Sequence, residues 1–132
     1  MVTDIIFIVA ALLVVDDDPD LLVLLSAHYG ARGYVVSVAE SCAGALRLAS
    51  ARRPDIVLLD FCLPKMGGKR FIEILRADEL TRATPVIVMS AASLDWVASS
   101  LAPGPLVNII EKPLDFAHLD SLIEELIAAR RV

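Results

Sequence analysis

The sequence predicts an α/β protein in which a parallel sheet is covered by helices. Five short apolar runs rich in β-branched residues alternate with five amphipathic stretches, a pattern typical of such sheets. The expected strands cover residues 9–15, 34–38, 55–60, 85–89 and 107–111. The expected helices cover residues 19–32, 42–52, 67–77, 93–101 and 116–130. The length of 132 residues suits one domain, so we expect a single domain over residues 1–132, with its core over about 9–130 and no effector domain.

Capping residues support the expected helix boundaries. Asp18 followed by Pro19 is typical of an N-cap and the first helical position. Gly30 and Gly33 are expected to end that first helix. Three further N-caps are expected at Ser41, Ser93 and Asp115. The last helix should carry one apolar stripe, formed by Phe116, Leu119, Leu122, Ile123, Leu126 and Ile127.

Composition and charge exclude several classes of protein. Hydrophobic residues make up 57% of the chain, but the longest apolar run covers only residues 5–15, which is too short to cross a bilayer. Asp4 is the only charge before that run, so we expect no signal peptide and a cytoplasmic location. The net charge is −5, and no basic cluster exceeds two adjacent arginines. Direct nucleic-acid binding is therefore not expected.

The two cysteines indicate neither a disulfide scaffold nor a zinc site. Cys42 and Cys62 are twenty residues apart, and neither belongs to a Cys-x-x-Cys or Cys/His pattern. Reduced thiols of this kind fit a cytoplasmic protein.

Polar side chains follow four of the five expected strands. Asp16 and Asp17 come after the first strand and Asp60 ends the third. Ser90 follows the fourth strand and Lys112 the fifth. Because ligands bind at the carboxyl ends of strands in open parallel sheets, we expect these side chains to meet at one edge.

The carboxylates predict a cation site with phosphoryl chemistry. Alone, residues 16–18 would fit a solvated helix start, but Asp60 ends a strand that should be central and buried. Clustered carboxylates raise one another's pKa unless a cation joins them. Mg²⁺ prefers oxygen ligands and needs only one or two protein carboxylates beside a phosphate. An aspartate held beside Mg²⁺ can attack phosphorus and form an acyl phosphate.

Lys112 and Ser90 each allow two interpretations. Lys112, placed at the end of a strand taken as central and followed by Pro113, could be a surface lysine before a turn. With Asp60 present, an ion pair across the sheet edge is favoured, because the ammonium would neutralise charge on phosphoryl oxygens. The Ser90 hydroxyl could bond a phosphoryl oxygen, or it could cap the next turn.

Five stretches, in this order and at compatible intervals, resemble the receiver domain of two-component response regulators. They are VVDDDP (14–19), PDIVLLD (54–60), LPKMGG (63–68), PVIVMSA (85–91) and KPLD (112–115). The resemblance extends from about residue 11 to residue 130. It implies a flavodoxin-like (βα)5 three-layer sandwich whose parallel five-stranded sheet has the order 2-1-3-4-5.

The resemblance also implies roles for the acidic residues. Asp60 matches the phosphoacceptor of the family. Asp16 and Asp17 match the acidic pair that, together with Asp60, holds Mg²⁺ or Mn²⁺. The backbone carbonyl of Cys62 would be a further metal ligand.

Two more positions match the rest of the family's site. Ser90 matches the switch hydroxyl, and Lys112 matches the ion-pair partner of the phosphoryl group, with a cis bond to Pro113. The family implies a switch that assists its own phosphorylation and dephosphorylation rather than a conventional enzyme. The implied partners are a sensor histidine kinase or phosphotransfer protein, a downstream protein target, and a second copy bound through the fourth helix, fifth strand and fifth helix.

Several positions depart from the family pattern. Ile109 stands where an aromatic residue is common, and Gly67 stands where Asp is common. Residues 102–105 (APGP) should stiffen the link between the fourth helix and the fifth strand. Trp96, the only tryptophan, is expected to be partly buried against its own sheet, with a role as a partner anchor as the alternative.

Two other functions compete with a phosphorylated switch. A degenerate receiver could act as a constitutive interaction module, which Ile109 favours and the complete site disfavours. A phosphatase of the haloacid-dehalogenase type would need a second acid two residues after the nucleophile, and Cys62 occupies that position.

Overall fold

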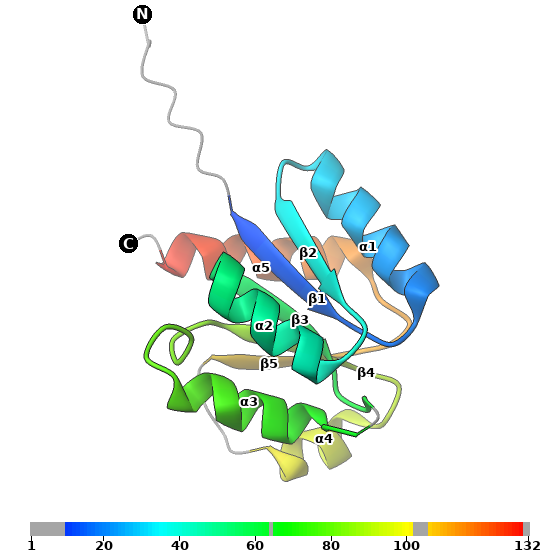
Figure 1. The fold of residues 1–132 in the computed structure, drawn as a ribbon. Helices are drawn as coiled ribbons and strands as arrows, with labels where there is room; N and C mark the ends of the chain where they lie inside the picture. The colour runs from blue at the N-terminus through cyan, green and yellow to red at the C-terminus, as the bar shows by residue number, and fades with distance from the viewer. Residues whose placement is uncertain (1–9, 64, 102–105, 131–132) are drawn as a thin grey trace, which may run out of the picture.

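Five parallel strands form one sheet in the order β2-β1-β3-β4-β5, as the sequence predicts (Figure 1). The computed structural model describes residues 10–63, 65–101 and 106–130. The strands are β1 (Ala11–Val15), β2 (Val35–Ala39), β3 (Ile56–Asp60), β4 (Val86–Ser90) and β5 (Val107–Glu111). The helices are α1 (Pro19–Ala31), α2 (Cys42–Arg52), α3 (Gly68–Ala77), α4 (Leu94–Ser100) and α5 (Phe116–Arg130). The predicted flavodoxin-like alternation is confirmed.

The sheet lies between two layers of helices. Helices α1 and α5 pack on one face, and α2, α3 and α4 pack on the other (Figure 1). Strands β3 and β4 are buried along their whole length, because both of their faces meet helices. This burial explains why their sequences are continuous apolar runs rather than alternating ones. The apolar stripe predicted for α5 is confirmed, since Leu119 and Ile123 are fully buried and its other members pack against the same core.

The predicted N-caps begin their helices. The Asp18 carboxylate accepts hydrogen bonds from the backbone N–H groups of Asp20 and Leu21, and Pro19 opens α1. Side-chain oxygens of three other residues accept a backbone N–H in the first turn of α2, α4 and α5, namely Ser41, Ser93 and Asp115. The end of α1 differs in detail from the prediction. Gly33 makes the turn with a φ of +94°, whereas Gly30 lies inside the helix.

The remaining boundaries agree with the sequence to within one or two residues. Helix α3 begins at Gly68 rather than 67, and α4 is one residue shorter at each end than predicted. The first nine residues and the 102–105 link, for which the sequence raised expectations, lie outside the described residues. Within the described ranges, no helix combines the length and the hydropathy that crossing a membrane would require.

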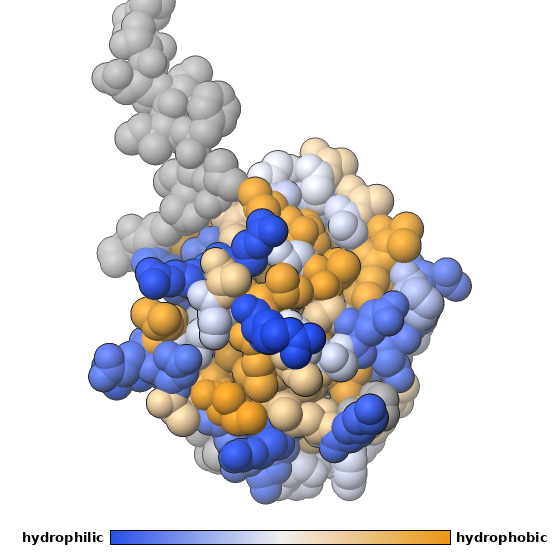
Figure 2. Space-filling model, in the orientation of Figure 1, coloured by the Kyte–Doolittle hydropathy of each residue, from blue (hydrophilic) through white to orange (hydrophobic). Residues whose placement is uncertain are grey.

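The outer edge of the sheet at β2 has an apolar surface. Figure 2 shows this surface over β2 and the adjoining side of α1. Val23 on α1 is 71% exposed, and Val35 and Val38 on β2 are also exposed. Strand β2 therefore forms a sheet edge with little charge, whereas the polar strand ends gather at a different place, the carboxyl edge of the sheet.

Candidate functional site

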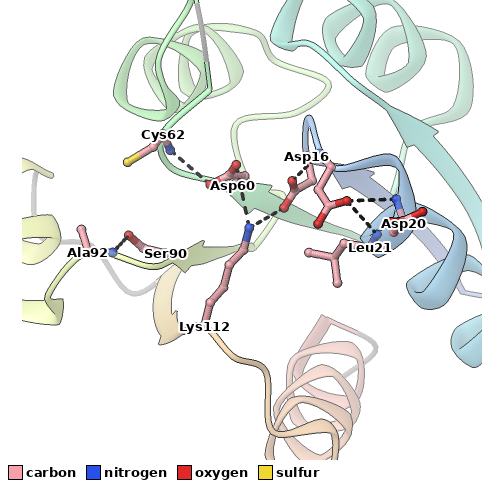
Figure 3. Close-up of polar contacts among 9 residues, drawn as sticks. Asp16, Asp20, Leu21, Asp60, Cys62, Ser90, Ala92 and Lys112 are labelled. Atoms are coloured by element: carbon pink, nitrogen blue, oxygen red, sulfur yellow. Dashed lines mark hydrogen bonds and ion pairs between the residues drawn. The ribbon is translucent and has the colours of Figure 1, made fainter.

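The strand order brings the predicted polar residues to one edge of the sheet (Figure 3). Asp16 follows β1, and Asp60 and Ser90 are the last residues of β3 and β4. Lys112 follows β5 directly. Because β1, β3, β4 and β5 are consecutive neighbours, residues nearly a hundred positions apart in sequence become a single row. The convergence predicted from the sequence is confirmed.

Three carboxylates form an acidic cluster at this edge. Asp16, Asp17 and Asp60 each place one carboxylate oxygen so that the three oxygens lie within 4.8 Å of one another. Asp16 is fully buried and Asp60 is buried, whereas Asp17 is exposed and leaves the cluster open to solvent. Three hard oxygen donors with one open side fit a Mg²⁺ ion that keeps several water ligands.

Asp16 is the most tightly held member of the cluster. Its backbone N–H donates to the carbonyl of Ala39 over 3.1 Å, which continues the β1–β2 ladder. Its Oδ1 accepts the N–H of Asp18 at 2.9 Å, and its Oδ2 accepts a hydrogen bond from Lys112 Nζ at 2.8 Å. A buried carboxylate is tolerated only with such partners. These three contacts therefore fix the position of the Asp16 carboxylate.

Lys112 lies between the two buried carboxylates (Figure 3). Its Nζ is 2.8 Å from Oδ2 of Asp16 and 3.9 Å from Oδ2 of Asp60. The predicted ion pair across the sheet edge is therefore present, but its shorter arm reaches Asp16 rather than Asp60. The peptide bond to Pro113 is cis, as the resemblance implies. Strand β5 is the edge strand of the sheet, so the placement of Lys112 on a central strand was wrong.

The pKa values of Asp60 and Lys112 are both raised. Burial raises the pKa of Asp60, the nearby charge of Asp16 raises it further, and Lys112 with the Cys62 N–H opposes the shift only in part. For Lys112, burial alone would lower the pKa, but the hydrogen bond to Asp16 and the charges of Asp60 and Asp16 outweigh it and raise it. The site thus carries unrelieved carboxylate repulsion, which a divalent cation would reduce.

Ser90 and Cys62 stand beside the carboxylates. The Ser90 hydroxyl is buried and accepts the N–H of Ala92 at 3.0 Å, so in this structure it caps the turn after β4. The Cys62 N–H donates to Oδ1 of Asp60 at 3.2 Å, and the Cys62 side chain is exposed. The predicted roles of the Ser90 hydroxyl toward a phosphoryl group and of the Cys62 carbonyl toward a metal remain predictions.

An aromatic contact next to the site was missed by the sequence reading. Trp96 on α4 is 53% exposed, so its expected burial against the sheet is wrong. The indole and the ring of Phe61 meet in a T-shaped arrangement, with ring centroids 5.7 Å apart and an interplanar angle of 83°. Phe61 is the residue directly after Asp60. Its position in the sequence was the available signal, but nothing in the spacing connects residue 61 with residue 96.

The structure is therefore a flavodoxin-like domain with an acidic cluster and one ammonium group at the carboxyl edge of its open parallel sheet. The family model for the response regulator receiver domain matches residues 12–124. This chain belongs to the family of response regulator receiver domains of two-component systems.

Individual relatives support that assignment. The chain is 36% identical over 121 residues to the transcriptional activator protein PfeR of Pseudomonas aeruginosa, covering 92% of this chain and 38% of PfeR. It is 29% identical over 119 residues to protein Rrf1 of Nitratidesulfovibrio vulgaris, covering 90% of this chain and 83% of Rrf1. The chain therefore spans well under half the length of PfeR.

A solved structure supports the fold independently. A response regulator receiver domain protein from Clostridium thermocellum superposes on this chain with a TM-score of 0.82 at 23% identity, covering 92% of this chain and 97% of that one. At this identity the likeness supports the fold rather than any functional detail.

Proposed function

We propose that this chain is a phosphorylation-controlled switch in which Asp60 accepts a phosphoryl group. The observation that carries the proposal is the cluster of Asp16, Asp17 and Asp60, whose oxygens lie within 4.8 Å of one another beside the ammonium of Lys112. Asp60 in particular is poorly suited to a purely structural role, because burial and the nearby charge of Asp16 both raise its pKa.

The cluster is suited to holding Mg²⁺ or Mn²⁺. The ligands would be the carboxylates of Asp16, Asp17 and Asp60 and the backbone carbonyl of Cys62. When bound, the ion would neutralise charge on the transferring phosphoryl oxygens and orient that group. The contacts of Asp16 with Asp18 and Lys112 would keep its side chain in place as the ion arrives.

The phosphoryl step follows from the placement of Asp60. The donor is a phosphohistidine on a sensor histidine kinase or a phosphotransfer protein. A carboxylate oxygen of Asp60 attacks phosphorus, the phosphorus–nitrogen bond to the donor imidazole breaks, and the imidazole takes up a proton as it leaves. The product is an acyl phosphate on Asp60. Lys112, already within 3.9 Å of Asp60, would neutralise the negative phosphoryl oxygens.

Ser90 would report the phosphoryl group to the rest of the domain. Its hydroxyl is occupied by the N–H of Ala92, at the start of the turn that leads to α4. Moving the hydroxyl onto a phosphoryl oxygen would exchange that hydrogen bond for a stronger, charge-assisted one and would release the turn. The domain would thereby assist its own phosphorylation and dephosphorylation without being an enzyme for an external substrate.

The domain would act through protein contacts. We assign residues 1–132 to one receiver domain that receives its signal from the kinase and passes it to a downstream protein. A homodimer through α4, β5 and α5 is one form that this output could take. The two free thiols, Cys42 and Cys62, suit a location in the reducing cytoplasm.

A degenerate receiver that works as a constitutive interaction module is the second candidate. Ile109 on β5 favours it, because an aliphatic side chain there cannot follow the Ser90 hydroxyl as an aromatic ring would. A phosphatase-type enzyme is disfavoured, because Cys62 and not an acid lies two residues after Asp60. Incubation with acetyl phosphate, read by intact mass, separates these functions. A switch gains one phosphoryl group with Mg²⁺ and none with EDTA, and a degenerate receiver gains none in either.

A further inference from the structure

Two separate routes connect the candidate site to Trp96. The first route runs through Phe61, which follows Asp60 in the chain and whose ring meets the indole edge to face at 5.7 Å between centroids. The second route runs through the turn after β4. Ala92 donates its N–H to the Ser90 hydroxyl, and Ser93, the next residue, accepts the N–H of Trp96 at 3.2 Å as the cap of α4.

Backbone hydrogen bonds hold Phe61, the residue after Asp60, on both sides. Its N–H donates to the carbonyl of Met89 at 3.0 Å, and its own carbonyl accepts the N–H of Gly68 at 3.2 Å. Gly68 packs closely against Phe61. A Cβ at position 68 would lie 3.0 Å from the Phe61 ring and 3.1 Å from the Phe61 backbone. Phe61 is therefore held between β4 and the start of α3, while its ring contacts Trp96 on α4.

Trp96 contacts both Phe61 and the solvent, so a binding partner can reach its indole. It is the largest side chain on α4 and is 53% exposed despite its contact with Phe61. Strand β5 offers no aromatic alternative at the facing position, because Ile109 is aliphatic and half-buried. Among the residues that the structure describes, the Phe61–Trp96 pair is thus the aromatic contact between the residue after Asp60 and helix α4.

We propose that the Phe61–Trp96 ring pair couples occupation of the Asp60 site to the position of α4, in the place of a moving aromatic side chain on β5. The proposal rests on the proposed phosphoryl site at Asp60. Trp96 is then the coupling residue whose indole changes its environment when the site fills, and Phe61 is the positioning residue that transmits the change. Coupling of this kind is reciprocal, so Trp96 must also influence ligand affinity at the site.

The fluorescence of Trp96 tests the proposal directly, because the chain contains one tryptophan. The probe is beryllium fluoride with Mg²⁺, a stable analogue of an aspartyl phosphate, and its binding is followed separately by ¹⁹F NMR. In the wild type, tryptophan emission should change along the same titration curve as the ¹⁹F signal. Beryllium fluoride that binds without any change in emission would overturn the coupling proposal and leave the proposed function intact. Failure to bind, together with no phosphorylation by acetyl phosphate, would instead overturn the proposed function and the coupling with it.

Two variants separate coupling from simple proximity. Phe61→Leu keeps an apolar side chain at this buried position but removes the ring, and should abolish most of the emission change while still binding the probe. Phe116→Leu, the same substitution on α5 against the opposite face of the sheet, should keep the full response. An unchanged response in Phe61→Leu would overturn the proposal.

A third variant tests reciprocity and does not depend on replacing a buried residue. Trp96→Ala changes a half-exposed side chain and should alter the affinity for beryllium fluoride by about fivefold or more. Combining it with Phe61→Leu should add little, because both changes remove the same contact. Unchanged affinity in Trp96→Ala, or fully additive effects in the double variant, would contradict the proposal.

Discussion

Lys112 hydrogen-bonds to Asp16 at 2.8 Å and stands 3.9 Å from Asp60, so the ammonium is held more closely by Asp16 than by Asp60. Oδ2 of Asp60 thus makes the longer of the two ion pairs, and its Oδ1 accepts the N–H of Cys62 at 3.2 Å. It also means that the lysine is already in position before an anionic ligand arrives. A preorganised charge of this kind needs little rearrangement when negative charge develops nearby.

Lys112→Ala should lower stability without Mg²⁺ and strengthen Mg²⁺ binding. Asp16 is fully buried and would lose one of its two side-chain partners, at a cost of about 2 kcal/mol in the free energy of unfolding. Removing a competing cation should tighten Mg²⁺ binding by roughly two- to tenfold. Urea unfolding and calorimetric titration check both effects, with Lys69→Ala on the exposed face of α3 as the control. Weaker Mg²⁺ binding in Lys112→Ala would show that the lysine organises the metal ligands.

Asp60→Asn should stabilise the protein without Mg²⁺ at neutral pH. The pKa of Asp60 is raised in the folded state by burial and by Asp16, so folding favours its protonated form. Below pH 3.8 the Asp60 carboxyl is protonated in both the folded and the unfolded protein, so it costs no stability. As the pH rises through the raised folded-state pKa, ionised Asp60 lowers the free energy of unfolding. The variant should therefore gain roughly 0.5–2 kcal/mol at pH 7 and little at pH 3.5. Urea unfolding at several pH values measures the difference, and a constant gain at all pH values would contradict this account.

Gly68→Ala should disturb the site, whereas Gly67→Ala should not. A Cβ at position 68 would press on the backbone of Phe61 at 3.1 Å, while a Cβ at position 67 meets nothing within 4 Å. The first change should cost about 1–3 kcal/mol of stability and shift Asp60, and the second should cost less than about 1 kcal/mol. Unfolding curves and phosphorylation rates of the two variants check this. Equal behaviour would mean that the contact with Phe61 can relax freely.

Local signals in the sequence predicted the alternation of strands and helices and the meeting of the polar strand ends, whereas the sheet order came from the resemblance to receiver domains. Apolar runs identify strands, Asp18 and Ser41 identify helix starts, and the parallel order places every strand end on one edge. Lys112 lies closer to Asp16 than to Asp60 because of how the side chains pack at the sheet edge. The spacing of residues in the sequence could not distinguish these two partners. The burial of Trp96 was mispredicted because α4 contributes one buried residue, Val97, and turns the indole toward Phe61 and solvent.

Cys62→Asn should shorten the lifetime of the phosphorylated protein. Hydrolysis of an acyl phosphate needs a water held in line with phosphorus, and the resemblance to receiver domains implies that the side chains of Cys62 and Ala92 flank the route of that water. Cys62 is exposed and Ala92 is half-buried. A thiol is a weak hydrogen-bonding group and a methyl group is none, so neither can orient a water well. We expect a long-lived wild-type phosphoprotein and faster phosphate release from Cys62→Asn, measured after removal of the donor. Rapid wild-type release that is unchanged in the variant would show that these positions do not control the water.

Intact mass spectrometry of the wild type and two variants tests whether Asp60 is the residue that accepts the phosphoryl group. Wild type, Asp60→Asn and Asp20→Asn should be incubated with acetyl phosphate and Mg²⁺ and compared by intact mass. Asp20 is an exposed carboxylate on the first turn of α1 next to the cluster, which makes it a matched control (Figure 3). We expect one phosphoryl group on the wild type and on Asp20→Asn, and none on Asp60→Asn, because an amide is not a nucleophile toward phosphorus. A phosphoryl group on Asp60→Asn at the wild-type level would contradict the assignment of Asp60.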